Sequence, residues 1–159
     1  MQWKVINPNP RTYAVILNEG ESVMEALADF VQQERLKGSQ FTAIGAFSEV
    51  MLGHFNLEKR DYKRVPVPQQ VEVLSLTGHV TIEGEAPRLH AQVVVGKPDG
   101  TAHGGHLIAA RARPTLEVIF VESASYLRRT FDERTGLVLL GFEGTPQVDW
   151  PETTTKGSS

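Results

Sequence analysis

One segment of the chain has the periodicity of an amphipathic helix. From Ser22 onward, apolar side chains recur at intervals of three to four residues and polar side chains fill the positions between them. The apolar residues are Val23, Leu27, Phe30 and Val31. Ser22 and Glu25 fit a capping box, in which each side chain accepts a hydrogen bond from a backbone N–H at the helix start. Gly38 is predicted to end the helix.

Most of the remaining chain consists of short runs rich in β-branched residues, separated by turn sequences that contain proline and glycine. The runs are residues 3–6, 13–17, 41–47, 49–55, 71–80, 89–95, 106–112, 116–121 and 137–142. One long helix followed by many strands predicts an α+β fold with a curled, mainly antiparallel sheet of about six or seven strands. We expect a second, short helix at residues 125–131.

Several predicted strands are apolar on both faces. In residues 116–121, one face carries Leu116, Val118 and Phe120, and the other carries Ile119 and Val121. A single helix covers only one face of such a sheet, and strands that are apolar on both faces need cover on both. Either the sheet curls toward a barrel or a second copy of the chain covers it. We favour the second solution, a homo-oligomer.

Composition and charge exclude several classes of function. The 159 residues include no cysteine, which excludes thiolate nucleophiles, disulfides and zinc–thiolate sites. No apolar run approaches the roughly 20 residues of a membrane span, and residues 1–8 lack a signal-peptide core, so we expect a cytoplasmic protein without a membrane partner. No phosphate-binding glycine motif is present, and we expect no nucleotide cofactor. The net charge of −3 does not favour binding to the DNA backbone.

The residues suited to chemistry concentrate on one predicted hairpin. His90, His103 and His106 fall within seventeen residues, and the turn 97–100 separates the first from the other two. Residues three apart in a regular strand face opposite sides, so a bulge at Gly104-Gly105 is needed to put His103 and His106 on one face. Three imidazoles are an established ligand set for catalytic zinc. We therefore expect a divalent metal such as zinc at this hairpin.

The register of the hairpin decides whether His90 can bind the same metal as His103 and His106. A loop of three to five residues places it close to the position opposite His106, whereas a two-residue turn at Asp99-Gly100 moves it several residues away. In the alternative interpretation, the histidines are partly buried polar residues that hydrogen-bond a bulged backbone. His54 and His79, each isolated in a predicted strand, are weaker candidates for ligands.

Three glutamates lie among apolar residues of the predicted strands. They are Glu72, Glu117 and Glu122. A buried carboxylate needs a partner, and we expect salt bridges to arginines rather than acid–base chemistry. The candidate arginines are Arg88, Arg111 and Arg113.

Several strings in the sequence resemble the PPC domain, the "plants and prokaryotes conserved" domain. The most specific are Leu-Ser-Leu-Thr-Gly at 74–78 and Gly-Gly-His-Leu at 104–107, and the resemblance extends over about residues 11–142. It implies a homotrimer built from a domain at residues 1–143. Residues 144–159 are expected to form a poorly ordered tail. The AT-hook that plant members carry is absent, so the chain resembles the stand-alone prokaryotic type.

The resemblance also implies a ligand set. Many prokaryotic members have Leu-His-x-His before the turn and Gly-Gly-His after it, which His90 and His106 match. Gln92 stands in place of the second histidine, and His103 is the candidate to substitute for it. Gln92 and Glu117 are expected around the ligands.

The resemblance implies a regulatory homotrimeric module that associates with DNA or DNA-bound proteins and carries a divalent metal. We weigh it against two alternatives, a metal-dependent hydrolase with the histidine site at a subunit interface and a pure assembly scaffold. Of these, we expect a non-catalytic role.

Overall fold

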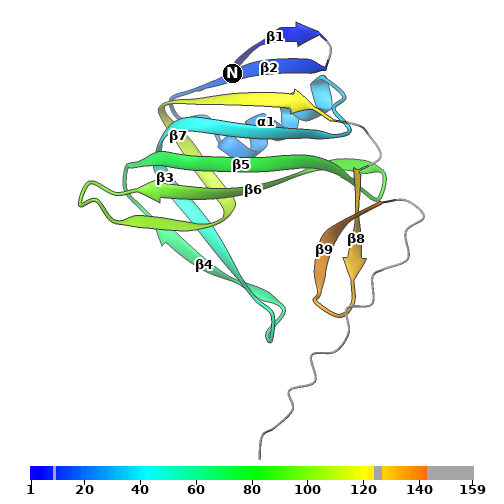
Figure 1. The fold of residues 1–159 in the computed structure, drawn as a ribbon. Helices are drawn as coiled ribbons and strands as arrows, with labels where there is room; N and C mark the ends of the chain where they lie inside the picture. Colours follow the sequence, from blue (N-terminus) through cyan, green and yellow to red (C-terminus); the bar gives the residue numbers. More distant parts are fainter. Residues whose placement is uncertain (9, 124–126, 143–159) are drawn as a thin grey trace, which may run out of the picture.

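A single curved sheet with one helix against it makes up the parts of the chain that the computed structural model describes, residues 1–8, 10–123 and 127–142 (Figure 1). The predicted tail 144–159 lies outside the described residues. The helix is α1 (Val23–Gln33). The strands are β1 (Gln2–Pro8), β2 (Arg11–Asn18), β3 (Ser39–Asn56), β4 (Asp61–Val67), β5 (Val71–Glu83), β6 (Ala86–Gly96), β7 (Ala102–Glu122), β8 (Leu127–Asp132) and β9 (Leu137–Phe142).

The nine strands follow the order β1-β2-β7-β3-β5-β8-β9, with β4 paired to β3 and β6 paired to both β5 and β7. All pairs are antiparallel except the short contact between β5 and β8. Since β3 pairs with β5 and β7, and β6 also pairs with both, these four strands form a closed ring of neighbours. The sheet is therefore mainly antiparallel and curls on itself.

Helix α1 buries the four residues that its periodicity indicates, Val23, Leu27, Phe30 and Val31. Ser22 is the N-cap but makes no side-chain capping hydrogen bond, so the predicted capping box is absent. The prediction that Gly38 ends the helix is also wrong, because the chain turns at Arg35, whose φ of 55° lies in the left-handed region. In the described ranges, no helix is long and apolar enough to cross a membrane.

Aromatic side chains join the helix to the inner face of the sheet. The Phe30 ring lies 5.3 Å from the ring of Tyr13 on β2 and 5.0 Å from that of Phe120 on β7. Phe120 in turn stacks on Phe41 of β3 at 4.7 Å. Each such ring pair adds roughly 0.5–1.5 kcal/mol beyond the burial of its apolar area. The helix is thus held over the strands that form the middle of the sheet.

The strand predictions are confirmed in position but not in length. Residues 41–47 and 49–55 belong to one 18-residue strand, and residues 106–112 and 116–121 to one 21-residue strand. The strand β4 is not among the predicted strands, and the predicted short helix falls where β8 is a strand paired with β9. Residues 124–126 of that predicted helix lie outside the described residues.

Among the three glutamates, Glu122 has the expected arginine partner, although not one of the three proposed. Arg11 donates to both of its carboxylate oxygens, at 2.8 and 2.6 Å. Arg111 and Arg113 pair instead with Glu49 and Glu19, at 3.6 and 3.3 Å. Glu72 and Glu117 are exposed. The carboxylate of Glu122 therefore joins the end of β7 to the start of β2.

We predict that Gly78→Ala destabilises the protein by about 1–3 kcal/mol, since extra atoms in a packed site force their neighbours to move. A Cβ at this β5 position would collide with the Phe41 ring and lie 2.6 Å from the His90 carbonyl oxygen. Urea unfolding measures the change. Gly141→Ala is the matched control, since its Cβ makes only an ordinary contact at 3.9 Å and should change stability by less than about 0.5 kcal/mol. Equal effects of the two substitutions would contradict this account.

Candidate functional site

The hairpin between β6 and β7 has a three-residue loop. Gly96 pairs with Ala102, and the Lys97 N–H donates to the Thr101 carbonyl at 2.8 Å across residues 98–100. Asp99 fixes the loop by accepting hydrogen bonds from the backbone and hydroxyl of Thr101. For a loop of this length, His90 is predicted to lie close to the position opposite His106.

The predicted bulge at Gly104-Gly105 is absent. Residues 92–96 of β6 pair with residues 106–102 of β7 without a register shift, so His106 lies opposite Gln92 and His103 lies opposite Val95. His103 and His106 therefore face opposite sides of the sheet. The glycines serve a different purpose, because a Cβ at Gly105 would lie 2.7 Å from the Gly53 carbonyl oxygen of β3. The absence of a Cβ at Gly105 lets β7 lie close to β3 at this point.

His90 and His106 do come together on the outer face of the sheet. Their ring centroids are 6.4 Å apart, and His79 of β5 lies directly across from His90. Burial lowers the pKa of both His90 and His106, and the positive charge of Arg129 acts in the same direction. Both imidazoles are therefore neutral at physiological pH, which is the form that binds metals. The Nε2 atom of His90 is buried and has no hydrogen-bond partner among the described residues.

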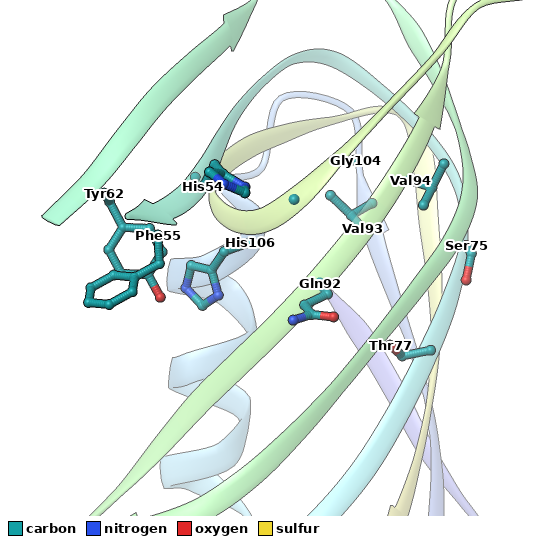
Figure 2. Close-up of a pocket in the computed structure, with 12 residues that line it drawn as sticks. His54, Phe55, Tyr62, Ser75, Thr77, Gln92, Val93, Val94, Gly104 and His106 are labelled. Carbon is teal, nitrogen blue, oxygen red and sulfur yellow. The ribbon is translucent and has the colours of Figure 1, made fainter. Parts of the chain in front are cut away.

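A pocket of about 520 Å³ opens beside His106 (Figure 2). Figure 2 shows His106 between Tyr62 of β4 and Gln92 of β6, and the Tyr62 ring lies 5.3 Å from the imidazole. The polar and aromatic side chains that line the pocket are His54, Phe55, Tyr62, Ser75, Thr77, Gln92 and His106. The pocket thus offers hydrogen-bonding groups on one side and aromatic rings on the other.

The structure brings together only part of the predicted metal site. His103 faces the other side, and Glu117 lies eleven residues along β7 from His106, beside Ile16 and Ile44. Within the described ranges, no group of three His, Cys, Asp or Glu side chains is arranged to hold a metal ion. The carboxylate of Glu83 lies beside His90, with its Oε2 3.9 Å from the His90 Nε2. Two of the three predicted imidazoles, His90 and His106, lie close together, and His103 does not join them.

Arg129 also belongs to this region, although it is not among the residues predicted for the site. Its guanidinium donates from Nε to the Thr81 hydroxyl at 3.2 Å and from Nη1 to the Val138 carbonyl at 2.9 Å. The only signal in the sequence was the basic pair 128–129, which occurs in a segment predicted to be helical. In a strand, adjacent residues face opposite sides, so Arg128 is exposed and Arg129 is half-buried.

The family model of the Plants and Prokaryotes Conserved (PCC) domain matches residues 6–124. The chain belongs to this family. The match covers the ring of strands, α1 and the whole β6–β7 hairpin, and it stops before β8 and β9. Arg129 therefore lies outside the matched PCC domain. Among curated proteins, none matches this chain significantly.

Solved structures share the fold over almost their entire length. A candidate DNA-binding protein from Bacteroides thetaiotaomicron superimposes with a TM-score of 0.84 at 27% identity, covering 89% of this chain and 97% of that one. A metal-containing protein from Archaeoglobus fulgidus has a TM-score of 0.76 at 29% identity, with 87% and 96% covered. A plant- and prokaryote-conserved (PPC) protein from Pyrococcus horikoshii has a TM-score of 0.76 at 26% identity, with 88% and 94% covered.

Proposed function

We propose that this PCC-domain protein is a homotrimeric module that acts in DNA-associated complexes and holds a divalent metal through His90 and His106. The observation that carries the proposal is an open apolar row on the outer face of the sheet. It comprises Ile16 of β2, Ile119 of β7, Ile44 of β3 and Leu74 of β5, all exposed. Exposed apolar side chains that gather on one face, here with the carboxylate of Glu117 among them, mark an interaction site.

The register supports a continuous surface. Ile16 and Ile44 flank Glu117 on either side of β7, and Ile119 lies next along the same face, between Ala14 and Thr42. Helix α1 packs against the inner face, so it does not cover this row. A second copy of the chain is the partner that the PCC family suggests. Three copies around one axis would each present the same row.

We predict that Ile44→Asp converts the trimer to a monomer. Ile44 is 63% exposed, so the substitution removes little from the monomer's core but adds a charge to the proposed interface. Size-exclusion chromatography with light scattering should give three times the 17.6 kDa chain mass for the wild type and one chain mass for the variant. Leu57→Asp is the control, because Leu57 is 62% exposed in the turn between β3 and β4. A wild-type monomer would refute the assembly.

The metal part of the proposal rests on the donor atoms. A neutral imidazole with a buried, unpartnered Nε2 suits a ligand position, and His106 lies diagonally across the two strands from it. Gln92 is on the same face, directly across from His106 and two residues along β6 from His90. With two imidazoles instead of three, zinc should be held less tightly than in a complete three-histidine site.

We predict that His90→Ala and His106→Ala each remove most of the zinc that the wild-type protein retains after zinc loading and desalting. His103→Ala should leave the zinc content unchanged, because His103 faces the other side of the sheet. Elemental analysis of the protein measures the metal per chain, and circular dichroism checks that each variant is folded. Loss of zinc from His103→Ala alone would point to a different ligand set.

The DNA-associated part of the proposal has one structural candidate for contact, the β3–β4 hairpin, which projects from the body in Figure 1. It carries four exposed basic residues in a protein whose net charge is −3. They are Lys59, Arg60, Lys63 and Arg64. Basic side chains concentrated on one projection can neutralise phosphates even when the whole molecule is acidic. The Bacteroides protein of the same fold is described as a candidate DNA-binding protein.

We predict that the double variant Lys63→Gln/Arg64→Gln weakens binding to a 30-base-pair duplex and lowers the slope of log affinity against log salt by about 2, one unit for each lost phosphate contact. Fluorescence anisotropy between 50 and 200 mM salt measures both quantities. Lys37→Gln/Arg88→Gln removes the same charge from exposed positions elsewhere and should leave the slope unchanged. Absence of wild-type binding at 50 mM salt would exclude direct DNA contact.

A further inference from the structure

Arg129 is a half-buried cation whose hydrogen-bond partners among the described residues are neutral. Its two hydrogen bonds go to the Thr81 hydroxyl and the Val138 carbonyl, and no carboxylate of the described residues lies within salt-bridge distance of the guanidinium. Thr81 is only 1% exposed. Taking a charge out of water is unfavourable unless an opposite charge compensates it. The described residues leave that compensation incomplete.

The strands around Arg129 place it near His79, His90 and His106. Thr81 is two residues from His79 on β5, so both side chains are on the same face, and His90 lies directly across from His79. β8 runs beside the end of β5, with Arg129 at the level of Glu83. The positive charge of Arg129 lowers the pKa of both His90 and His106, which agrees with this placement. One guanidinium and two neutral imidazoles therefore meet on one surface.

The hairpin that carries Arg129 is fixed at both ends. At its base, β8 pairs with β5 through Arg128 and Arg129. At its tip, Arg60 from the β3–β4 turn donates from Nη2 to the Arg134 carbonyl at 3.1 Å. The two hairpins thus bracket the outer surface around His106. A ligand there would be approached by Arg129 from one hairpin and by Tyr62 from the other.

We propose that this surface binds the oxyanion group, a carboxylate or a phosphate, of a small organic ligand, with Arg129 as the residue that anchors the anion. The planar guanidinium suits such a group because it donates two parallel hydrogen bonds to a pair of oxygens. Neutral His106 and His90 can add a hydrogen bond each through a ring N–H.

Apolar side chains of the protein lie on both sides of Arg129, where they can contact the organic part of the ligand. Tyr62 and Phe55, whose rings are 5.0 Å apart, form the aromatic wall of the adjoining pocket. On β8 and β9, Phe131 and Leu140 share the face of Arg129, since Arg129 pairs with Leu140 and Phe131 is two residues away. Phe131 is 60% exposed. An anion with an aromatic ring matches this combination better than an inorganic ion.

Glu83 is the carboxylate that competes with such a ligand. It lies at the level of Arg129 on the neighbouring strand, and it raises the pKa of Arg129 against the lowering effect of burial. Its Oε2 points to the His90 Nε2 at 3.9 Å rather than forming a salt bridge to the guanidinium. Removing this negative charge should therefore strengthen the binding of an anion.

The test uses the full-length protein after treatment with EDTA, with benzoate and phenyl phosphate as anionic probes and benzyl alcohol as the neutral probe. Isothermal titration calorimetry at low ionic strength should show binding of at least one anion and none of the alcohol. Arg129→Gln should weaken that binding at least tenfold, and Glu83→Gln should strengthen it. Arg128→Gln removes the same charge from the exposed face of β8 and should have no effect. The comparison of benzoate with phenyl phosphate distinguishes a carboxylate site from a phosphate site.

A second measurement does not depend on the folding of a variant. In the wild-type protein, a bound anion should shift the Nε–Hε signal of Arg129 in a ¹H–¹⁵N spectrum, and benzyl alcohol should not. Absence of binding by both anions would overturn the proposal, and so would equal effects of Arg128→Gln and Arg129→Gln.

A repeat of the titrations with added zinc keeps this proposal separate from the metal site. Anion binding that requires zinc and is insensitive to Arg129→Gln would overturn the proposal, because the anion would then be a metal ligand. A failure of His90 and His106 to hold zinc leaves the titrations of the EDTA-treated protein unaffected.

Discussion

The pairing of β3 with β7 is the constraint on which the rest of the structure depends. Both strands are long enough to belong to two parts of the sheet, so β7 pairs with β6 along one half and with β2 along the other. A slip of one residue would turn Phe41, Val118 and Phe120 from the core to the solvent. The burial of these side chains therefore sets the register from Ser39 to Gly45 of β3, and three register shifts follow farther along the pair.

That register also decides what lies on the outer face. With Val118 and Phe120 directed toward α1, Ile119 and Glu117 must face outward beside Ile44. At the other end of the same pair, Gly53 is opposite His106, and the ring of strands then fixes Gln92 and His90. The apolar row and the histidine pair are thus two regions of one surface that the single helix does not cover. The proposed assembly and the proposed ligand binding would therefore share one surface.

The sequence predicted most local features and few of the relations between distant segments. The burial stripe of α1 could be predicted because it depends only on spacing within the helix, and the strands were found from their apolar runs. The continuity of β3 through Ser48 and of β7 through Pro114 was missed, since a proline or a polar residue in an apolar run is a normal sign of a turn. The strand β8 was missed because its identity comes from its pairing with β9, which no local pattern records.

The histidine hairpin illustrates the same limit at the level of the site. The sequence predicted a set of His90, His103 and His106, and the structure brings only His90 and His106 together. The family-like glycines suggested a bulge that the register excludes. Gly105 has no room for a Cβ because Gly53 of β3 passes close to it, and a contact between strands that are some fifty residues apart is invisible in a hairpin considered alone. His103 consequently could not be separated from the pair by spacing.

Gln92 and Arg129 together make this surface less suited to a cation, and Arg129 makes it better suited to an anion. An amide in place of an imidazole leaves a divalent cation one strong ligand short. A guanidinium beside the two remaining imidazoles repels a cation and attracts an anion, and the repulsion is stronger where burial lowers the local dielectric. Glu83 partly offsets this, because its carboxylate lies on the same surface. The selectivity of the surface between cations and anions therefore depends on which partner Glu83 takes, His90 or Arg129, and the structure has it nearer to His90.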